Sequence, residues 1–245
     1  MKKWPNTACN GLTTLDDMMQ TSMPQGYLFD MDGLLLDTER VGLQSFLTVC
    51  ETFDIERGHA EPFFLSLIGG SREVNAAKSE QFLGRQVCHK EFEIQWLAHK
   101  DRLMHEGVPL RPFVRDVIGA LAASGAKMAV VTSTIGERAR AELARAGLLD
   151  HFELVVAGDE VRANKPDPAP YLQGAAALGL DPKHCAAFED SDTGITAAVR
   201  AGCRAVQIPD LRPQNKPLPD LGHLVASDLR AALALVAPDF KSQLI

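Results

Sequence analysis

Two aspartates separated by one residue follow the first apolar run of the chain. The run Tyr27-Leu28-Phe29 is of the kind that is buried in a parallel sheet, and Asp30 and Asp32 come directly after it. Residues two apart on a strand point to the same face, so the two carboxylates can converge, while Gly33 allows a sharp turn behind them. Adjacent carboxylates repel unless a cation or shared proton lies between them, and oxygen ligands suit Mg²⁺. A solvated acidic turn would explain the same residues.

A hydroxyl-rich loop follows the second predicted strand. Thr132 and Ser133 precede a predicted helix over residues 136–146, and Thr134 with Glu137 three positions later has the pattern of a capping box. This pattern predicts free amides beside Thr132 and Ser133, where hydroxyl and amide groups can hold phosphate oxygens. For this segment taken by itself, helix capping without any ligand is the simpler interpretation.

A third loop contains a lysine between an asparagine and a proline. Pro166 disfavours helical backbone at Lys165, so the loop is expected to be stiff at this point. Asp167 can cap a helix that begins at Pro168, because proline is well tolerated at the first helical position. Lys165 is then either a fixed cation that faces developing negative charge or an ordinary surface lysine.

A fourth loop is acidic and ends another apolar strand. Glu189 and Asp190 follow Cys185–Phe188 and are expected at the same sheet edge as Asp30 and Asp32. Asp190 is a candidate direct metal ligand, and Glu189 is a candidate for the surrounding layer of side chains. The alternative is an acidic helix start that interacts favourably with the helix dipole.

The apolar pattern places these four loops in one kind of fold. Strands that alternate with helices of about ten residues imply right-handed βαβ units and a parallel sheet covered on both faces, hence an α/β, three-layer Rossmann-like core. Such sheets bind ligands beyond the carboxyl ends of their strands, where the strand order reverses. The predicted strands are Tyr27–Phe29, Lys127–Thr132, Leu154–Val156, Cys185–Phe188, Ala205–Ile208 and Leu224–Val225. The predicted helices are Val114–Ser124, Gly136–Ala146, Pro168–Leu178, Asp192–Ala201 and Leu229–Val236.

The stretch between the first strand and the rest of that core has a helical pattern and no predicted strand. We therefore predict an all-helical domain over residues 40–109, inserted into a core formed by residues 26–39 and 110–245. Residues 1–25 show no sustained period and are predicted to be a mobile N-terminal arm. The apolar residues at helical spacing in the insertion are Val41, Leu43, Phe46, Leu47, Val49, Cys50, Phe92, Trp96, Leu97 and Leu103.

Composition and charge exclude several classes of protein. The 245 residues are 46% hydrophobic and 23% charged, with a formal net charge of −7, which argues against binding to the phosphate backbone of nucleic acids. No apolar run has the length of a membrane span, and no apolar stretch follows the basic opening residues as in a secretion signal. Five widely spaced cysteines without a CxxC pair fit a reducing compartment, so we expect a cytoplasmic protein.

In their order along the chain, the four loops resemble the four motifs of the haloacid dehalogenase (HAD) superfamily. The nearest likeness within it is to the β-phosphoglucomutases and the small phosphosugar or phosphoglycolate phosphatases, and the resemblance extends over about residues 28–236. The matching segments are Phe29-Asp30-x-Asp32-Gly33, Val131-Thr132-Ser133, Asn164-Lys165-Pro166-Asp167-Pro168 and Glu189-Asp190-Ser191-x-x-Gly194-Ile195.

The resemblance implies a phosphatase that forms an aspartyl-phosphate. Asp30 would be the nucleophile, and Asp32 would protonate the leaving oxygen and then deprotonate the attacking water. Thr132, Ser133 and Lys165 would bind the phosphoryl oxygens, with positioning and electrostatics supplying most of the catalysis. The implied substrate is a small phosphate monoester, such as a phosphosugar, and the protein is expected to be a monomer or weak dimer.

The resemblance also implies Mg²⁺ as the cofactor. Its ligands would be the carboxylates of Asp30 and Asp190 and the backbone carbonyl of Asp32, with Glu189 close to the ion. The seven histidines show no metal-ligand spacing, which is consistent with a site built from oxygen ligands alone.

The helical insertion corresponds to the C1 cap of this superfamily, which covers the site and contributes specificity. Residues 69–72 resemble a cap loop that presents an arginine, so Arg72 either contacts a distal carboxylate, phosphate or polyol or is an exposed arginine at a helix start. Asp37, Thr38 and Glu39 lie at the hinge into the cap. Thr38 and Glu39 either contact substrate or cap the first cap helix, and capping is the preferred interpretation.

Other branches of the superfamily fit less well. Asp32 argues against the dehalogenases and the phosphonate-cleaving enzymes, which lack it. A β-phosphoglucomutase-like sugar phosphomutase is the alternative function, but that enzyme has a histidine where this chain has Gly42, which favours a phosphatase. A non-catalytic relative is disfavoured because all five residues needed for turnover are present: Asp30, Asp32, Thr132, Lys165 and Asp190. Arg111-Pro112-Phe113 departs from the usual Pro-Gly-Val and changes the cap hinge rather than the chemistry.

Overall fold

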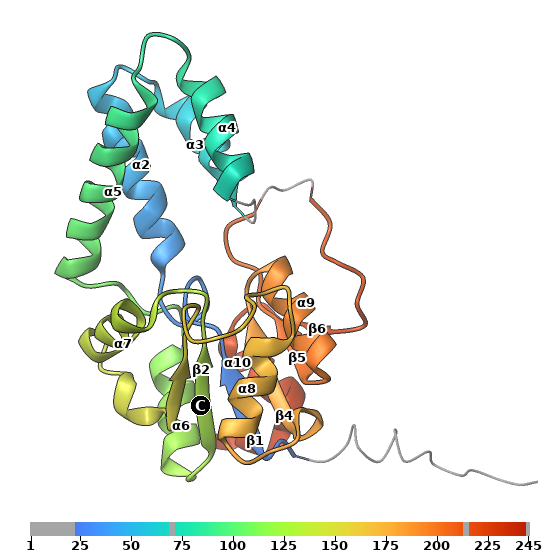
Figure 1. The fold of residues 1–245 in the computed structure, drawn as a ribbon. Coiled ribbons are helices and arrows are strands. Elements are labelled where there is room, and N and C mark those ends of the chain that lie inside the picture. The colour runs from blue at the N-terminus through green and yellow to red at the C-terminus, as the bar shows by residue number, and fades with distance from the viewer. Residues whose placement is uncertain (1–22, 69–71, 213–215, 244–245) are drawn as a thin grey trace, which may run out of the picture.

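In the residues that the structure describes, a six-stranded parallel sheet forms the centre of the core (Figure 1). The computed structural model describes residues 23–68, 72–212 and 216–243. The strand order is β3-β2-β1-β4-β5-β6, so the chain reverses direction across the sheet between β1 and β4. The strands are β1 (Gly26–Phe29), β2 (Lys127–Val131), β3 (Leu154–Val156), β4 (Cys185–Glu189), β5 (Arg204–Gln207) and β6 (Leu224–Val225).

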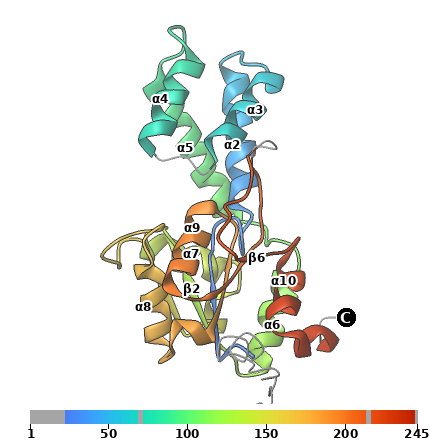
Figure 2. The ribbon, with the colours of Figure 1, turned by 90° about the vertical axis from the view of Figure 1, so that its right-hand side faces the viewer.

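Helices cover both faces of this sheet, as the alternation of strands and helices predicted (Figure 2). Side chains alternate along each strand, so that Phe29 packs with α6 (Val114–Ala123) and α10 (Leu229–Val236), while its neighbour Leu28 packs with α8 (Ala169–Ala177) and α9 (Asp192–Ala201). The α/β three-layer core is therefore confirmed. The core helices are α6 (Val114–Ala123), α7 (Gly136–Arg145), α8 (Ala169–Ala177), α9 (Asp192–Ala201) and α10 (Leu229–Val236). The 3₁₀ turns are η1 (Leu149–His151), η2 (Pro182–His184) and η3 (Pro238–Gln243).

In the described part of the insertion, four further helices stand over the carboxyl edge of the sheet (Figure 1). Phe46 lies at the centre of their aromatic core, with ring centroids of Phe92 and Trp96 at 5.4 and 5.3 Å. Leu97, another apolar residue at helical spacing, is 46% exposed, because α5 (His89–Glu106) buries only the face that carries Phe92 and Trp96. The helices are α2 (Thr38–Thr52), α3 (Arg57–Leu67), α4 (Arg72–Leu83) and α5 (His89–Glu106).

The chain departs from the expected pattern at the start of α6. Phe113 has a φ of 63°, a left-handed conformation that glycine adopts without strain. Its ring packs under the guanidinium carbon of Arg230, 4.1 Å from the ring centroid. Phe113 thus places a bulky side chain on a turn of the backbone that favours glycine.

The domain limits inferred from the sequence stay predictions, although α2 begins at Thr38, two residues before the predicted insertion. Of the predicted N-terminal arm, residues 1–22 lie outside the described residues, while the amide of Gln25 donates to the carbonyl of His184 at 2.8 Å. Among the helices described, none is both long and apolar enough to cross a membrane.

Candidate active site

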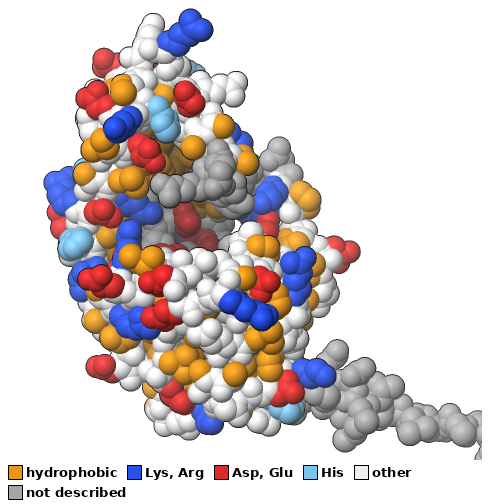
Figure 3. Space-filling model, in the orientation of Figure 1, with side chains coloured by type: hydrophobic (Ala, Val, Ile, Leu, Met, Phe, Trp, Pro, Cys, Tyr) orange, Lys and Arg blue, Asp and Glu red, His pale blue; other side chains and the backbone are white. Residues whose placement is uncertain are grey.

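The point where the strand order reverses brings three acidic side chains together. Asp30 follows β1 and Asp190 follows β4, and these strands are paired through Phe29 and Phe188. Carboxylate oxygens of Asp30, Glu189 and Asp190 lie within 4.8 Å of one another. This is the sheet edge at which α/β folds bind ligands. In Figure 3, acidic side chains lie at the base of a hollow between the insertion and the core.

Lys165 supplies the positive charge next to these carboxylates. Its Nζ donates to Asp30 Oδ1 at 2.5 Å, to Glu189 Oε1 at 2.6 Å and to the Val131 carbonyl at 2.8 Å. Burial alone would lower the pKa of Lys165, but the carboxylates of Asp30 and Glu189 outweigh it and raise that pKa above its usual range. Lys165 is therefore a fixed cation with only 5% of its side chain exposed.

The carboxylates outnumber this single ammonium group. Burial, followed by repulsion from Glu189, raises the pKa of Asp30 well above its ordinary value, although Lys165 opposes the shift. Burial and repulsion from Asp30 and Glu189 raise the pKa of Asp190 in the same direction. Such an oxygen-only donor set, with Asp30 and Glu189 buried and Asp190 partly buried, fits a hard divalent cation, which would stabilise the ionised forms. The residues present therefore fit Mg²⁺.

Two glycines make room for the acidic residues. A Cβ at Gly33, where φ is 82°, would overlap the carboxylate of Asp190. A Cβ at Gly194, in the first turn of α9, would overlap the carboxylate of Glu189. The close packing of Asp190 and Glu189 against the backbone thus requires glycine at both positions.

Glu189 is tied into the protein more tightly than the sequence indicated. Its side chain is fully buried; Oε1 accepts from Lys165 and from the Tyr171 hydroxyl at 2.7 Å, and Oε2 accepts from the Ser191 hydroxyl at 3.1 Å. Burial, followed by the charge of Glu189, raises the pKa of Tyr171, so the phenol stays a donor. Sequence reasoning missed Tyr171, whose signal was a lone phenol in an Ala-rich helix.

Asp32 stands apart from the three-carboxylate group. Its Oδ2 accepts from the Thr134 hydroxyl at 2.7 Å and from the Thr132 hydroxyl at 3.4 Å. Thr132 itself is buried, and Ser133 beside it is exposed. A half-buried carboxylate held by hydroxyls is placed to exchange protons with a ligand above the sheet edge.

The predicted capping box at this loop is wrong. The N-cap residue of α7 is Ile135, whose side chain makes no capping hydrogen bond. The Thr134 hydroxyl donates to Asp32, and the amide of Gly136 at the start of the helix donates to Oδ1 of Asp159 at 2.8 Å. In contrast, Asp167 does accept from an amide at the start of the next helix, that of Ala169, at 2.8 Å.

The hinge residues are placed differently from the preferred interpretation. Thr38 and Glu39 lie inside the first turn of α2, so neither caps it, and the N-cap residue Asp37 makes no capping hydrogen bond. Glu39 lines a cavity of about 370 Å³ within the insertion, together with Trp96 and Lys100. Burial raises the pKa of Glu39, and Lys100 opposes that shift.

The predicted substrate contact of Arg72 stays a prediction. The loop of residues 69–71 and the side chain of Arg72 lie outside the described residues.

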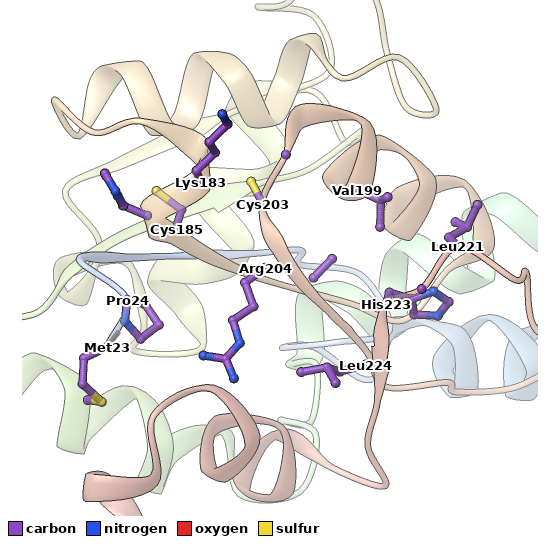
Figure 4. Close-up of a pocket in the computed structure, with 14 residues that line it drawn as sticks. Met23, Pro24, Lys183, Cys185, Val199, Cys203, Arg204, Leu221, His223 and Leu224 are labelled. Carbon is purple, nitrogen blue, oxygen red and sulfur yellow. The ribbon is translucent and has the colours of Figure 1, made fainter. Parts of the chain in front are cut away.

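Another cavity, of about 570 Å³, lies at the opposite edge of the sheet (Figure 4). Cys185, Arg204 and Leu224, the first residues of β4, β5 and β6, line it. None of the candidate catalytic residues contributes to its wall, so the carboxyl edge is the candidate active site.

The chain belongs to the haloacid dehalogenase-like hydrolase family, which residues 27–208 match. The family resemblance of the four motifs is therefore confirmed. Proteins similar to this chain include a phosphatase of phosphorylated carbohydrates and, in fold alone, a β-phosphoglucomutase from Clostridium difficile.

Individual relatives cover most of the chain. YhcW of Bacillus subtilis (strain 168) is 31% identical over 224 residues, which are 90% of this chain and 100% of that protein. The phosphorylated carbohydrates phosphatase of Thermotoga maritima is 29% identical over 182 residues, 74% of this chain and 83% of the relative. A HAD family hydrolase from Deinococcus radiodurans R1, solved with bound phosphate and sodium, has a TM-score of 0.72 at 25% identity and covers 88% and 99% of the two chains.

Proposed function

We propose that this protein, a phosphatase of the haloacid dehalogenase-like family, hydrolyses small sugar phosphates or related metabolites at Asp30 with the help of Mg²⁺. The observation that carries the proposal is the contact of one buried ammonium group, Lys165, with both Asp30 and Glu189. It supports a site in which a carboxylate, a fixed cation and a metal position share one phosphoryl group.

The reaction would proceed in two displacements. In the first, a carboxylate oxygen of Asp30 forms a bond to phosphorus as the ester oxygen leaves, and Asp32 gives that oxygen a proton. In the second, Asp32 takes a proton from water as the water oxygen bonds to phosphorus, and the Asp30 carboxylate is released. The Thr134 hydroxyl, which donates to Asp32 Oδ2 at 2.7 Å, would hold the Asp32 carboxyl group in place for both transfers.

Other residues would stabilise the phosphoryl group during both steps. Lys165 donates toward its oxygens and fixes the direction of the Asp30 carboxylate, and Thr132 and Ser133 provide hydroxyl and amide donors. Asp30, Asp190, the Asp32 carbonyl and neighbouring Glu189 would hold Mg²⁺, which supplies charge neutralisation for the phosphoryl oxygens.

The substrate class is supported by the cap and by a relative. The insertion offers an aromatic wall with charged groups, Glu39 and Lys100, at one cavity, a mixture suited to a polar organic leaving group. The name of the Thermotoga relative, a phosphorylated carbohydrates phosphatase, points the same way. The proposal includes a cytoplasmic monomer or weak dimer and contacts from Arg72, Thr38 or Glu39 to the substrate.

The test is a phosphate-release screen over sugar phosphates, phosphoglycolate and nucleotides, each with Mg²⁺ and with chelator. We expect release from one or more sugar phosphates, its loss with chelator and its return with excess Mg²⁺. No release from any substrate, or release indifferent to chelator, would refute the proposal. A hexose 1-phosphate with a bisphosphate primer separates the mutase alternative, which would yield the 6-phosphate instead of free phosphate.

A further inference from the structure

Two linkers connect the insertion to the core: the outgoing linker before α2 and the returning linker between α5 and α6. A cluster of opposite charges joins both linkers to the core. We call Asp37, Arg40, Arg111 and Asp210 the hinge cluster. Oδ1 of Asp210 accepts from Arg40 Nη1 at 2.8 Å and pairs with Arg111 Nη2 at 2.9 Å. Arg40 Nη1 also donates to Asp37 Oδ1 at 2.8 Å, and Arg111 Nη1 lies 3.7 Å from the same oxygen.

The four residues come from three separate parts of the chain. Asp37 and Arg40 belong to the outgoing linker and the first turn of α2, whereas Arg111 belongs to the returning linker. The two linkers are also paired through their backbones, since the Asp37 amide donates to Pro109 at 2.8 Å and the Arg111 amide to Leu35 at 3.0 Å. Asp210 is the contribution of the core. A single carboxylate of the core therefore contacts arginines of both linkers.

Burial makes the contact between Asp210 and Arg111 stronger than an ordinary surface ion pair, whereas the side chain of Arg40 is 47% exposed. The side chain of Asp210 is 1% exposed and that of Arg111 is 14% exposed. Oδ2 of Asp210 is buried without a hydrogen-bond partner among the described residues. A buried carboxylate depends on its cationic partners, so a linker that swings away from Asp210 would leave an uncompensated charge.

The loop that carries Asp210 also reaches the acidic loop of the active site. It leaves β5 after Gln207, whose Nε2 donates to the Asp190 carbonyl at 3.2 Å and to Asp192 Oδ1 at 3.1 Å. Two residues beyond Asp210, Arg212 donates to the same Asp192 oxygen at 3.1 Å. The position of the linkers and the position of the Asp190 loop are thus set by one segment of the core.

We propose that Asp210 is a positioning residue that fixes the cap over the active site through Arg40 and Arg111. In this arrangement Asp210 holds Arg40 and thereby positions the preceding residue, Glu39, toward the ligand. The kinetic test of this inference rests on the proposed phosphatase function. It predicts that Asp210 matters for substrates large enough to touch the cap and little for a phosphate ester that is too small to reach it.

The kinetic test compares two substrates in Asp210→Asn, Arg40→Gln and the control Asp220→Asn, an exposed aspartate of the same loop. For the sugar phosphate hydrolysed fastest, we expect kcat/KM to fall about tenfold or more in Asp210→Asn, against about threefold or less for acetyl phosphate. Arg40→Gln should act in the same direction, and the double variant should lose less than the product of the two single losses. Equal losses on both substrates, or no loss, would overturn the inference. Absence of all activity in the wild-type protein would refute the proposed function instead.

Hydrogen exchange provides a test that needs no activity. In Asp210→Asn we expect the exchange of the Asp37 and Arg111 amides to rise about tenfold, with amides of the central strands β1 and β4 unchanged. Asp220→Asn should leave all of them as in the wild type. Unchanged exchange at the linkers, or an equal rise throughout the core, would contradict a specific role at the hinge.

Discussion

The ammonium nitrogen of Lys165 lies 2.5 Å from Oδ1 of Asp30, although the two residues are 135 positions apart in the chain. The two residues lie in different loops at the carboxyl edge of the sheet, and both are almost fully buried. The contact orients a carboxylate that would otherwise be repelled by Glu189 and Asp190. Catalysis, metal binding and local stability should therefore all depend on it.

Replacing the lysine by an apolar side chain of similar length tests this dependence. We expect Lys165→Met to lower kcat by about 10²–10³-fold, because a fixed donor to the phosphoryl oxygens is lost. Without Mg²⁺, the variant should also lose about 3–5 kcal/mol of unfolding free energy, since buried carboxylates lose their cation. Steady-state kinetics and denaturant unfolding measure the two effects. Lys183→Met, at an exposed lysine, is the control; equal behaviour of the two variants would contradict the assignment.

Mg²⁺ binding should release protons and strengthen with pH. Burial and neighbouring carboxylates raise the pKa of Asp30 and of Asp190, so in the metal-free protein these groups hold protons to higher pH than usual. The ion binds the ionised forms, and its apparent affinity should therefore rise as pH rises through this raised range. Calorimetry in buffers of different ionisation enthalpy measures the protons released. Affinity that falls with rising pH would contradict the carboxylate site.

The acidic loop should also be sensitive to a single added methyl group. In Gly33→Ala the new Cβ would overlap Asp190, so we expect Mg²⁺ affinity to fall at least about tenfold in addition to a loss of about 1–2 kcal/mol from the positive φ. Gly125→Ala is a matched control, with a φ of 72° and open space around its Cβ. It should lose similar stability and keep its Mg²⁺ affinity in a metal titration. Loss of affinity in both variants would mean that backbone strain, and not the overlap with Asp190, is responsible.

Tyr171 should act through Glu189 and not on the substrate. Tyr171→Phe keeps the buried ring and removes one hydrogen bond, so we expect about 1 kcal/mol less stability and a fall of about three- to tenfold in kcat with KM nearly unchanged. Thermal unfolding measures the loss of stability, and initial-rate kinetics measure the changes in kcat and KM. A large rise in KM with constant kcat would instead place the phenol in contact with substrate.

Much of the core could be predicted from the sequence because its elements are short and strongly periodic. The strand at Leu154–Val156 and the helices at Asp192–Ala201 and Leu229–Val236 have the predicted limits. Glycine follows α6, α7 and α8 within two residues, and these helices and the other core strands differ from their predicted limits by at most one residue at either end. The acidic and basic loops could be placed at one edge because parallel strands share a direction.

The remaining details depend on contacts between distant residues. Thr134 has the local pattern of a capping residue, but α7 has Ile135 as its N-cap residue, and the Thr134 hydroxyl donates to Asp32, 102 positions away. Asp159 then caps α7 from another loop. Asp210 and Tyr171 have no local signal for their ionic and hydrogen-bonded partners, which are fixed only when the sheet assembles.

The most direct test of the account is the turnover of Asp30→Asn on the best sugar phosphate with saturating Mg²⁺. The amide cannot act as the nucleophile, so we predict a loss of about 10³-fold or more in kcat with the fold intact by circular dichroism. Asp150→Asn, at an exposed aspartate, should retain wild-type turnover. Full turnover by Asp30→Asn would contradict the proposal that this carboxylate bonds to phosphorus.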